Sequence, residues 1–375
     1  MGRQTQFPAT TPNPDAKLGS MSDAQYQSAM VLFGQGRHAE GVDLLALAAK
    51  NGHVPSMSLL GGQLLTGRGG APCDQPSGIR LILAAAERGG GFACATAATL
   101  FAAGYSGRAE WPRALDYLQR SAEMGYQPAQ EQLRLLSGFK AGTDWKRLRR
   151  AVDLAAWRKP PRLQALSEKP AIHAAPELLS AALCDALIAR AAPRLAPATI
   201  YNEQTGGSTL EDTRTNSAAE FPITELDLVL LLVRERLCAL AGQPAIHAEN
   251  CQVLHYEVGQ RFAPHFDFLD PGFVGHAGTL AHSGQRVATV LVYLNDGFEG
   301  GETDFPRIGL RHRGAKGDAL VFRNVDEEGR PDLLTLHAGL TPTRGEKWLL
   351  SLWVRDRIPG GLDDPRLAEA MRTYA

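Results

Sequence analysis

Three features that define other protein classes are missing from this sequence: a paired-cysteine pattern, a long apolar run and an excess of one charge. The five cysteines are scattered and include no C-x-x-C pair, which excludes a disulfide framework and favours a reducing compartment. No stretch approaches roughly 18 apolar residues, so we expect no transmembrane helix. The 39 basic and 40 acidic side chains nearly balance, and the short basic run at 146–150 is typical of a solvated helix face. We therefore predict a cytoplasmic protein with no nucleic-acid or membrane partner.

Composition divides the chain into five segments. Residues 1–21 are rich in proline and threonine and lack the apolar core of a signal peptide, so they are predicted to form a disordered tail. Residues 22–140 have alanine, leucine and glycine at helical spacing. Residues 141–175 are first basic and then punctuated by prolines, as expected of a connector. A second domain is predicted over 176–358, followed by a C-terminal tail over 359–375.

The helical segment repeats. Gly52, Gly89 and Gly125 each follow a similar alanine-rich stretch, with 37 residues between the first two and 36 between the last two. A glycine in this place ends a helix, because it tolerates positive φ. A period in the mid-thirties with two helices per unit predicts an α-solenoid that presents a surface to a protein partner. A generic alanine-rich helical bundle is the alternative. The pattern resembles Sel1-like repeats, which are related to tetratricopeptide repeats.

The second domain changes from helical to strand-like patterns. Amphipathic helices are predicted over 176–190 and 225–240. Short apolar runs broken by glycine and proline then predict strands, of which the clearest are 252–256, 287–294, 319–322 and 348–354. Several short strands of this kind favour a barrel or jelly roll over a parallel sheet. The predicted fold class is therefore α+β.

A histidine and an acid two residues apart form the first candidate metal site. Chance predicts about one such pair here, and the sequence contains four: His38/Glu40, His247/Glu249, His255/Glu257 and His265/Asp267. The last pair alone lies between two predicted strands and is followed at a suitable distance by a further histidine, His337. Two histidines and one carboxylate leave three positions open on Fe(II), as an oxygenase requires.

Lys347 follows His337 by ten residues and opens the last apolar run. A lysine at the start of a buried strand needs an anion near its ammonium group, and the distal carboxylate of 2-oxoglutarate is such an anion. A solvated strand end is the commoner explanation for Lys347 taken alone.

Six motifs follow one another in the second domain: QVLHYEVGQRFAPHFD at 252–267, RVATVLVYLN at 286–295, GGETDFP at 300–306, KGDALVF at 316–322, LHAG at 336–339 and GEKW at 345–348. In sequence and order these motifs resemble those of Fe(II)/2-oxoglutarate oxygenases of the prolyl 4-hydroxylase type. The resemblance covers roughly residues 175–357 and implies a double-stranded β-helix, which is a jelly roll of two sheets.

The resemblance implies a role for each matching residue. It implies Fe(II) with 2-oxoglutarate and O₂ as co-substrates, and it makes ascorbate a candidate reductant. His265, Asp267 and His337 would hold the iron. The co-substrate would be bound by Lys347, at its C5 carboxylate, and by Tyr256 and Thr303. Tyr256 has the alternative of a core tyrosine, and Thr303 that of a turn residue.

Two features bear on the substrate. Phe262 stands where the family often has a tyrosine, and the longer glycine-rich segment 270–285 contains His276 and His282 and is predicted to be a mobile lid. Arg286 matches a position near the substrate mouth, although a surface arginine is an equal alternative. Phe262 and the segment 270–285 both depart from the family's pattern. They leave the oxidative chemistry intact but weaken the prediction that the substrate is a peptidyl proline.

The predicted reaction is hydroxylation of an unactivated C–H, coupled to conversion of 2-oxoglutarate into succinate and CO₂. A prolyl residue of a protein or peptide is the first choice, because the helical repeats suit recruitment of a protein. Hydroxylation of a free amino acid or small metabolite is the alternative among enzymes. Outside enzymes, the chain would be a repeat-based interaction scaffold with an inactive oxygenase domain.

Overall fold

The computed structural model describes residues 21–359, apart from 106, 160–161, 203–206, 210 and 223–224. The two predicted tails lie outside the described residues except at Met21 and Pro359. The chain divides into two compact units, with the division between Val152 and Asp153. None of the described helices is both long and apolar enough to span a membrane.

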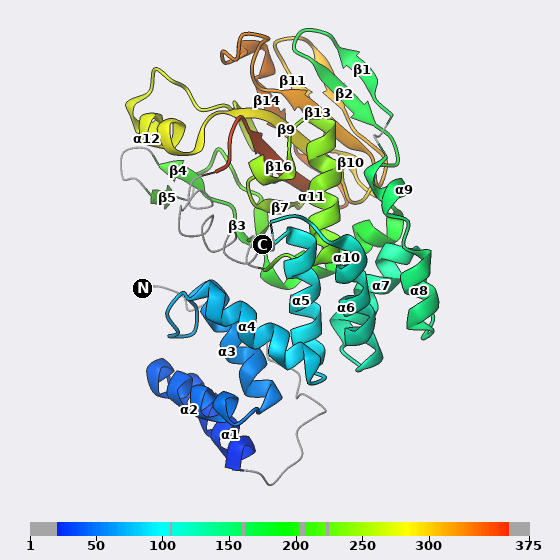
Figure 1. The fold of residues 1–375 in the computed structure, drawn as a ribbon. Helices are drawn as coiled ribbons and strands as arrows, with labels where there is room; N and C mark the ends of the chain where they lie inside the picture. The colour runs from blue at the N-terminus through cyan, green and yellow to red at the C-terminus, as the bar shows by residue number, and fades with distance from the viewer. Residues whose placement is uncertain are drawn as a thin grey trace. The chain divides into compact units, whose positions relative to one another are not determined.

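The first unit is built from consecutive helices that pack mainly on their neighbours in the chain (Figure 1). Gly52, Gly89 and Gly125 follow α2, α4 and α6 with φ of 81°, 92° and 83°, so their predicted role in ending helices is confirmed. The prediction of helical repeats is therefore confirmed. The helices are α1 (Met21–Gly34), α2 (His38–Lys50), α3 (Val54–Thr66), α4 (Gln75–Glu87), α5 (Gly91–Ala103), α6 (Trp111–Glu123), α7 (Gln127–Ser137) and α8 (Trp145–Ala151).

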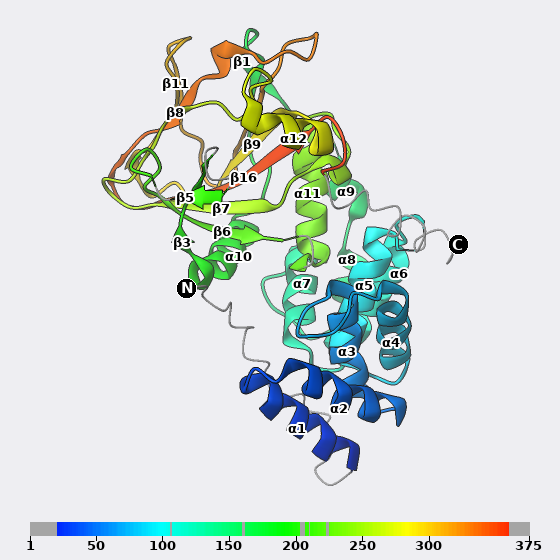
Figure 2. The same ribbon diagram turned by 90° about the vertical axis from the view of Figure 1, so that its left-hand side faces the viewer.

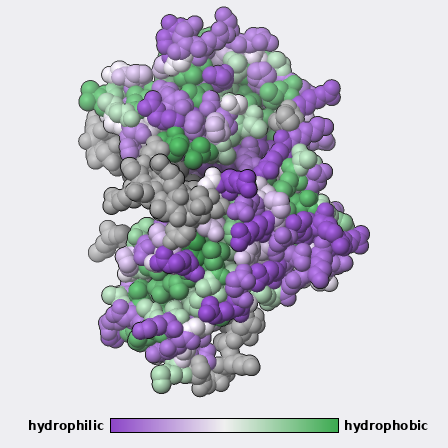
Figure 3. All heavy atoms as spheres, viewed as in Figure 1, coloured by the Kyte–Doolittle hydropathy of each residue, from purple (hydrophilic) through white to green (hydrophobic). Residues whose placement is uncertain are grey.

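Small residues allow the close approach of these helices. Ala48, Ala85 and Ser121 occupy the same place in successive repeats, four residues before the glycine, and all three are fully buried. The Ser121 hydroxyl donates to the Gly91 carbonyl oxygen at 2.6 Å, which ties α6 to the start of α5. The basic run on α8 is exposed at Lys146, and Figure 3 shows hydrophilic residues gathered over the region of α6 and α8.

The second unit is an antiparallel β structure with helices α9 (Leu154–Arg158), α10 (Ala181–Ala191), α11 (Leu228–Leu240) and α12 (Val274–Ser283) (Figure 2). Its strands are β1 (Gln164–Ser167), β2 (Ile172–Ala175), β3 (Ala196–Pro197), β4 (Ile200–Asn202), β5 (Gly207–Thr209), β6 (Ser217–Phe221), β7 (Cys251–Tyr256), β8 (Phe262–His265), β9 (Arg286–Tyr293), β10 (Glu299–Gly300), β11 (Thr303–Phe305), β12 (Leu310–His312), β13 (Ala319–Arg323), β14 (His337–Gly339), β15 (Pro342–Arg344) and β16 (Lys347–Arg355).

Two sheets carry the site. The larger has eight strands in the order β1-β2-β13-β9-β16-β7-β6-β3, and the smaller has four in the order β12-β11-β14-β8. The apolar strands β9 and β16 lie at the centre of the larger sheet and are buried along almost their whole length. All four predicted strands are present, as are both predicted helices, so the α+β class is confirmed. The double-stranded β-helix topology stays a prediction.

The segment 141–175, which is predicted to be a connector, contains more regular secondary structure than a connector would. It holds α8, α9, β1 and β2, and β2 pairs with β13 as part of the larger sheet. Ile172 is fully buried there. The two strands are four residues long and lie among prolines, so their sequence gives little sign of a sheet edge.

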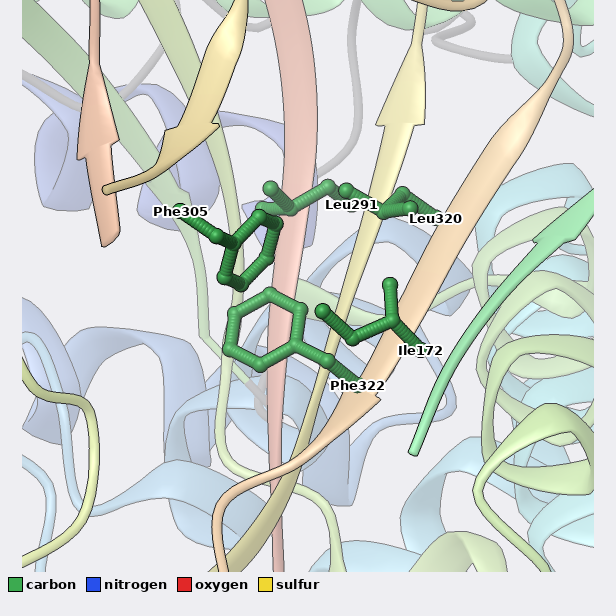
Figure 4. Packing of buried hydrophobic residues seen from close by; sticks show 5 residues of the cluster. All are labelled: Ile172, Leu291, Phe305, Leu320 and Phe322. Atoms are coloured by element: carbon green, nitrogen blue, oxygen red, sulfur yellow. The ribbon is translucent and has the colours of Figure 1, made fainter. Parts of the chain in front are cut away.

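A hydrophobic cluster joins the two sheets (Figure 4). Phe305 from the smaller sheet and Phe322 from the larger meet edge to face, with ring centroids 5.2 Å apart. The same two rings lie 5.7 Å and 4.8 Å from the ring of His337. Burial of each large side chain contributes about 2 kcal/mol. The cluster therefore fixes both sheets and one side of His337. Its members are Ile172, Leu291, Phe305, Leu320 and Phe322.

Candidate metal centre

The structure brings the three predicted ligands together. His265 ends β8, Asp267 follows two residues later, and His337 opens the neighbouring strand β14, where it pairs directly with His265. Asp267 lies 3.6 Å from Nε2 of His265 through Oδ1 and 3.4 Å from Nε2 of His337 through Oδ2. One candidate ligand atom from each residue lies within 4.8 Å of the others. No other such group of His, Cys, Asp or Glu occurs in the described part of the chain.

Backbone carbonyls orient both imidazoles. Nδ1 of His265 donates to the Ala263 carbonyl oxygen at 2.8 Å, and Nδ1 of His337 donates to the Thr335 carbonyl oxygen at 3.0 Å. A carbonyl oxygen can only accept, so in each neutral ring the proton is on Nδ1. Nε2 of each ring therefore keeps a free lone pair, which is the form that binds a metal.

A chain of two hydrogen bonds holds Asp267 in place. The Thr289 hydroxyl donates to Asp267 Oδ2 at 2.6 Å, and the Asn324 side-chain amide donates to the Thr289 hydroxyl at 3.0 Å. Sequence reasoning missed both supporting residues. The available signal was Thr289 itself, because it is a polar residue inside the apolar run of β9 and is 1% exposed.

The protonation states suit a divalent cation. Burial alone would raise the pKa of Asp267, but the charges of His337 and His265 and the Thr289 hydrogen bond hold it well below its usual range. Burial, followed by the charge of His265, lowers the pKa of His337 to about 4. At neutral pH the site thus offers a carboxylate and a neutral imidazole, so metal binding displaces no proton from either. Two imidazoles and one carboxylate fit Fe(II).

Lys347 lies in the same cavity as the triad. The side chain is fully buried, and its Nζ makes no hydrogen bond with the described residues. Burial lowers the pKa of Lys347 to about 7, against the opposing charge of Glu302. A buried ammonium without a partner is costly. The cavity is therefore suited to an anionic ligand at this end.

Tyr256 and Thr303 also line this cavity. Tyr256 is 2% exposed, and burial raises its pKa to about 12. The Thr303 hydroxyl lies 3.0 Å from the Tyr293 hydroxyl, which donates to the His312 carbonyl oxygen at 3.0 Å. Thr303 is therefore the donor to Tyr293 in the ligand-free chain, and its hydroxyl would have to rotate to donate to a co-substrate carboxylate. Sequence reasoning did not single out Tyr293, although its ring centre lies 5.9 Å from Lys347 Nζ.

Comparison with known proteins decides the family. Residues 251–355 match the 2OG-Fe(II) oxygenase superfamily. The chain is 31% identical to probable prolyl 4-hydroxylase 10 of Arabidopsis thaliana over 235 residues, which cover 58% of this chain and 75% of that protein. It is 33% identical to prolyl 4-hydroxylase 1 of the same plant, with coverages of 52% and 72%. The chain belongs to the prolyl 4-hydroxylase family of 2OG-Fe(II) oxygenases.

Two solved structures are similar to part of this 2-oxoglutarate-dependent dioxygenase. The viral collagen prolyl hydroxylase of Paramecium Bursaria Chlorella virus-1, in complex with 2OG, is 27% identical and covers 49% of this chain and 94% of its own, with a TM-score of 0.38. A Sel1 repeat protein from Oxalobacter formigenes is 20% identical and covers 36% of this chain and 61% of its own, with a TM-score of 0.29. The family implies Fe(II), 2-oxoglutarate and O₂ for the dioxygenase.

Of the two predicted substrate residues, the structure of the dioxygenase brings one to the cavity. Phe262 lines it, with its ring stacked on that of His265 at a centroid distance of 3.5 Å. Arg286 does not line it. Its guanidinium instead binds both oxygens of Glu249, at 2.6 Å and 2.9 Å, and lies 3.7 Å from the ring centre of Trp353. Trp353 lines the cavity, so Arg286 contacts a lining residue without lining the cavity itself.

The predicted lid segment 270–285 contains helix α12 in place of an irregular glycine-rich loop, and its motion stays a prediction. Gln285 closes the base of this excursion, because its side chain accepts from the Leu269 amide and donates to the Leu269 carbonyl, each at 2.7 Å. His276 and His282 lie on α12 and do not join the triad.

Proposed function

We propose that this dioxygenase hydroxylates an unactivated C–H of a prolyl residue in a protein or peptide, with release of succinate and CO₂. One observation carries the proposal: an iron-type triad and a buried lysine, which has no hydrogen-bond partner among the described residues, open into the same cavity. The similar plant proteins named prolyl 4-hydroxylases support the choice of proline.

In this proposal each side chain has a defined task. His265 and His337 hold the metal through Nε2, and Asp267 holds it through a carboxylate oxygen that Thr289 orients. When bound, Fe(II) supplies the oxidising chemistry together with 2-oxoglutarate and O₂. Lys347 binds the distal carboxylate of 2-oxoglutarate, and this ion pair removes the cost of burying the ammonium group.

The cavity walls exclude water from the reacting groups. Leu254, Leu291 and Leu349 line the cavity and are at most 7% exposed. In such apolar surroundings the attraction between Lys347 and a carboxylate is several-fold stronger than in water. Tyr256 and Thr303 add hydroxyl groups to the same wall, so we assign them to the orientation of the co-substrate.

The helical repeats are proposed to recruit a protein substrate, since arrays of this kind offer an extended surface. Hydroxylation of a free amino acid or small metabolite is the second candidate, and Phe262 favours it because a hydroxyl is missing from the substrate side. An inactive scaffold is the least favoured function, since all three ligands and Lys347 are retained. Ascorbate as a reductant stays a prediction.

Mass spectrometry separates the substrate classes. The chain would be incubated with Fe(II), 2-oxoglutarate and a cell lysate, and a gain of 16 Da would be sought in proteins and, separately, in the amino-acid pool. The proposal expects the gain on prolyl residues of the protein fraction. A double variant, His265→Ala with Asp267→Ala, controls for background oxidation. A product confined to the amino-acid pool would replace the protein substrate by the second candidate.

A further inference from the structure

A second buried cation lines the cavity. Arg214 is 8% exposed and precedes strand β6, and its backbone forms a bridge with Phe262 on β8. The flanking backbone is also held, because the Ala263 amide donates to the Thr213 carbonyl oxygen and the Thr215 amide to that of Arg261. The base of the Arg214 side chain is therefore fixed beside the strand that carries His265.

The hydrogen-bond acceptors that the described residues offer to the Arg214 guanidinium are neutral. Nε donates to Asn216 Oδ1 and Nη1 donates to the Thr199 carbonyl oxygen, both at 3.2 Å. Among the described residues no Asp or Glu forms an ion pair with Arg214. Arg286 and Arg355 contrast with it, because both form ion pairs with Glu249, at 2.6 Å and 2.8 Å. A buried guanidinium without a carboxylate is costly unless a ligand supplies one.

Arg214 lies one aromatic ring away from the candidate metal ligand His265. Its guanidinium carbon lies 4.6 Å from the centre of the Phe262 ring, and that ring stacks on His265. Asp267 is the described carboxylate whose charge acts on Arg214, but it belongs to the triad. Burial lowers the pKa of Arg214, and the charges of Tyr256 and Asp267 offset this effect only in part.

The charges around the cavity leave Arg214 available for the substrate. Lys347 takes the 2-oxoglutarate carboxylate in the proposed function. Arg286 and Arg355 share the single carboxylate of Glu249, so these three side chains together have a net charge of +1. Trp353 adds a further donor to the cavity, since its buried indole Nε1 has no acceptor among the described residues.

We propose that Arg214 anchors a carboxylate of the molecule that is hydroxylated. The inference rests on the proposed dioxygenase function and names the substrate class as an acid. The carboxylate has two sources: the free α-carboxylate of an amino acid, or an acidic side chain next to the target residue in a peptide. The fork of an arginine matches two carboxylate oxygens, and the Phe262 ring keeps its plane in position.

Acid and amide pairs test this assignment. One pair is L-proline and L-prolinamide. The other is a capped tetrapeptide, Ala-Pro-Glu-Ala, and its Ala-Pro-Gln-Ala counterpart. Succinate release gives kcat/KM for each compound, and calorimetry without O₂ gives its Kd for the chain loaded with Fe(II) and 2-oxoglutarate. The variants are Arg214→Gln and Arg214→Lys, with Arg344→Gln as the matched control because Arg344 is 78% exposed.

For at least one pair, wild type is expected to bind the acid more tightly than the amide, with Kd lower and kcat/KM higher by about 10- to 100-fold. This is the effect of one hydrogen-bonded contact with a charged group. The pair that shows the preference identifies the source of the carboxylate. Arg214→Gln is expected to lose the preference, Arg214→Lys to keep part of it and Arg344→Gln to keep it. Equal binding of acid and amide in both pairs, or an unchanged preference in Arg214→Gln, overturns the inference. A wild type that binds the acids but never forms succinate refutes the proposed function instead.

Discussion

Lys347 and Tyr256 stand opposite one another on the neighbouring strands β16 and β7, with the Lys347 ammonium 5.1 Å from the centre of the Tyr256 ring. Both side chains are buried and line the cavity of the triad. Strand pairing therefore places an ammonium group and a phenol side by side. Burial of the Lys347 ammonium group destabilises the ligand-free protein, and an anionic co-substrate would remove this destabilisation.

The first prediction concerns the stability of the ligand-free protein. Lys347→Met is expected to raise the free energy of unfolding by about 1–3 kcal/mol, because it replaces an unpartnered buried charge by an apolar side chain of similar length. The variant is also expected to lose stabilisation by 2-oxoglutarate. Urea unfolding with and without 2-oxoglutarate measures both effects, and Lys146→Met on the exposed face of α8 is the control. A less stable Lys347→Met would contradict the account.

The pH dependence of stability gives a second prediction. The pKa of Lys347 is about 7 in the folded chain, against about 10.4 when unfolded. Between these values the unfolded chain binds more protons, so the contribution of Lys347 to stability rises with pH. Wild type is expected to approach the stability of Lys347→Met as the pH rises from 7 to about 10. The affinity for 2-oxoglutarate should fall over the same range, since the ion pair needs the protonated lysine. A stability difference that stays constant with pH would refute this assignment.

Local sequence signals predicted most of the fold. The strands that hold the site were predictable because β9 and β16 are long apolar runs with turn residues at their ends. The repeats were predictable because Gly52, Gly89 and Gly125 recur at nearly constant spacing. The strands β1 and β2 were not predictable, since each is short and is stabilised mainly by pairing within the larger sheet.

Long-range contacts limited the prediction of the site. The order of motifs along the chain was enough to single out His265 and Lys347. Thr289 and Asn324 were missed because their role depends on a hydrogen-bond chain between strands. Arg286 begins β9, where a position near the substrate entrance was predicted. Its guanidinium binds Glu249, which lies 37 residues away in the sequence, so this contact could not be predicted from local patterns.

A third prediction tests the support of Asp267. Thr289→Val keeps the shape of the side chain and removes the hydroxyl that donates to Asp267. Fe(II) affinity is expected to fall by about 10- to 100-fold, as for other groups that orient a metal ligand. Thr289→Ser retains the hydroxyl and should stay close to wild type. Anaerobic titration with Fe(II) measures the affinities, and equal values for the valine and serine variants would exclude the supporting role.

The fourth prediction concerns Glu249, whose carboxylate is shared by Arg286 and Arg355. Glu249→Gln leaves two poorly exposed arginines without an anion, so we expect a loss of about 3 kcal/mol in the free energy of unfolding. Glu299→Gln is the matched control, because Glu299 and Arg344 form an exposed ion pair that should contribute less than about 1 kcal/mol. Similar losses in the two variants would show that the shared carboxylate has no special role.

His265, Asp267 and His337 are expected to hold the iron that the dioxygenase needs. The most direct test measures iron content after anaerobic loading, together with Fe(II)-dependent succinate release. Wild type and the control double variant His282→Ala with Glu299→Ala are expected to bind equimolar iron and turn over 2-oxoglutarate. The double variant His265→Ala with Asp267→Ala is expected to do neither. Equal iron content or equal succinate release in that variant would contradict the account.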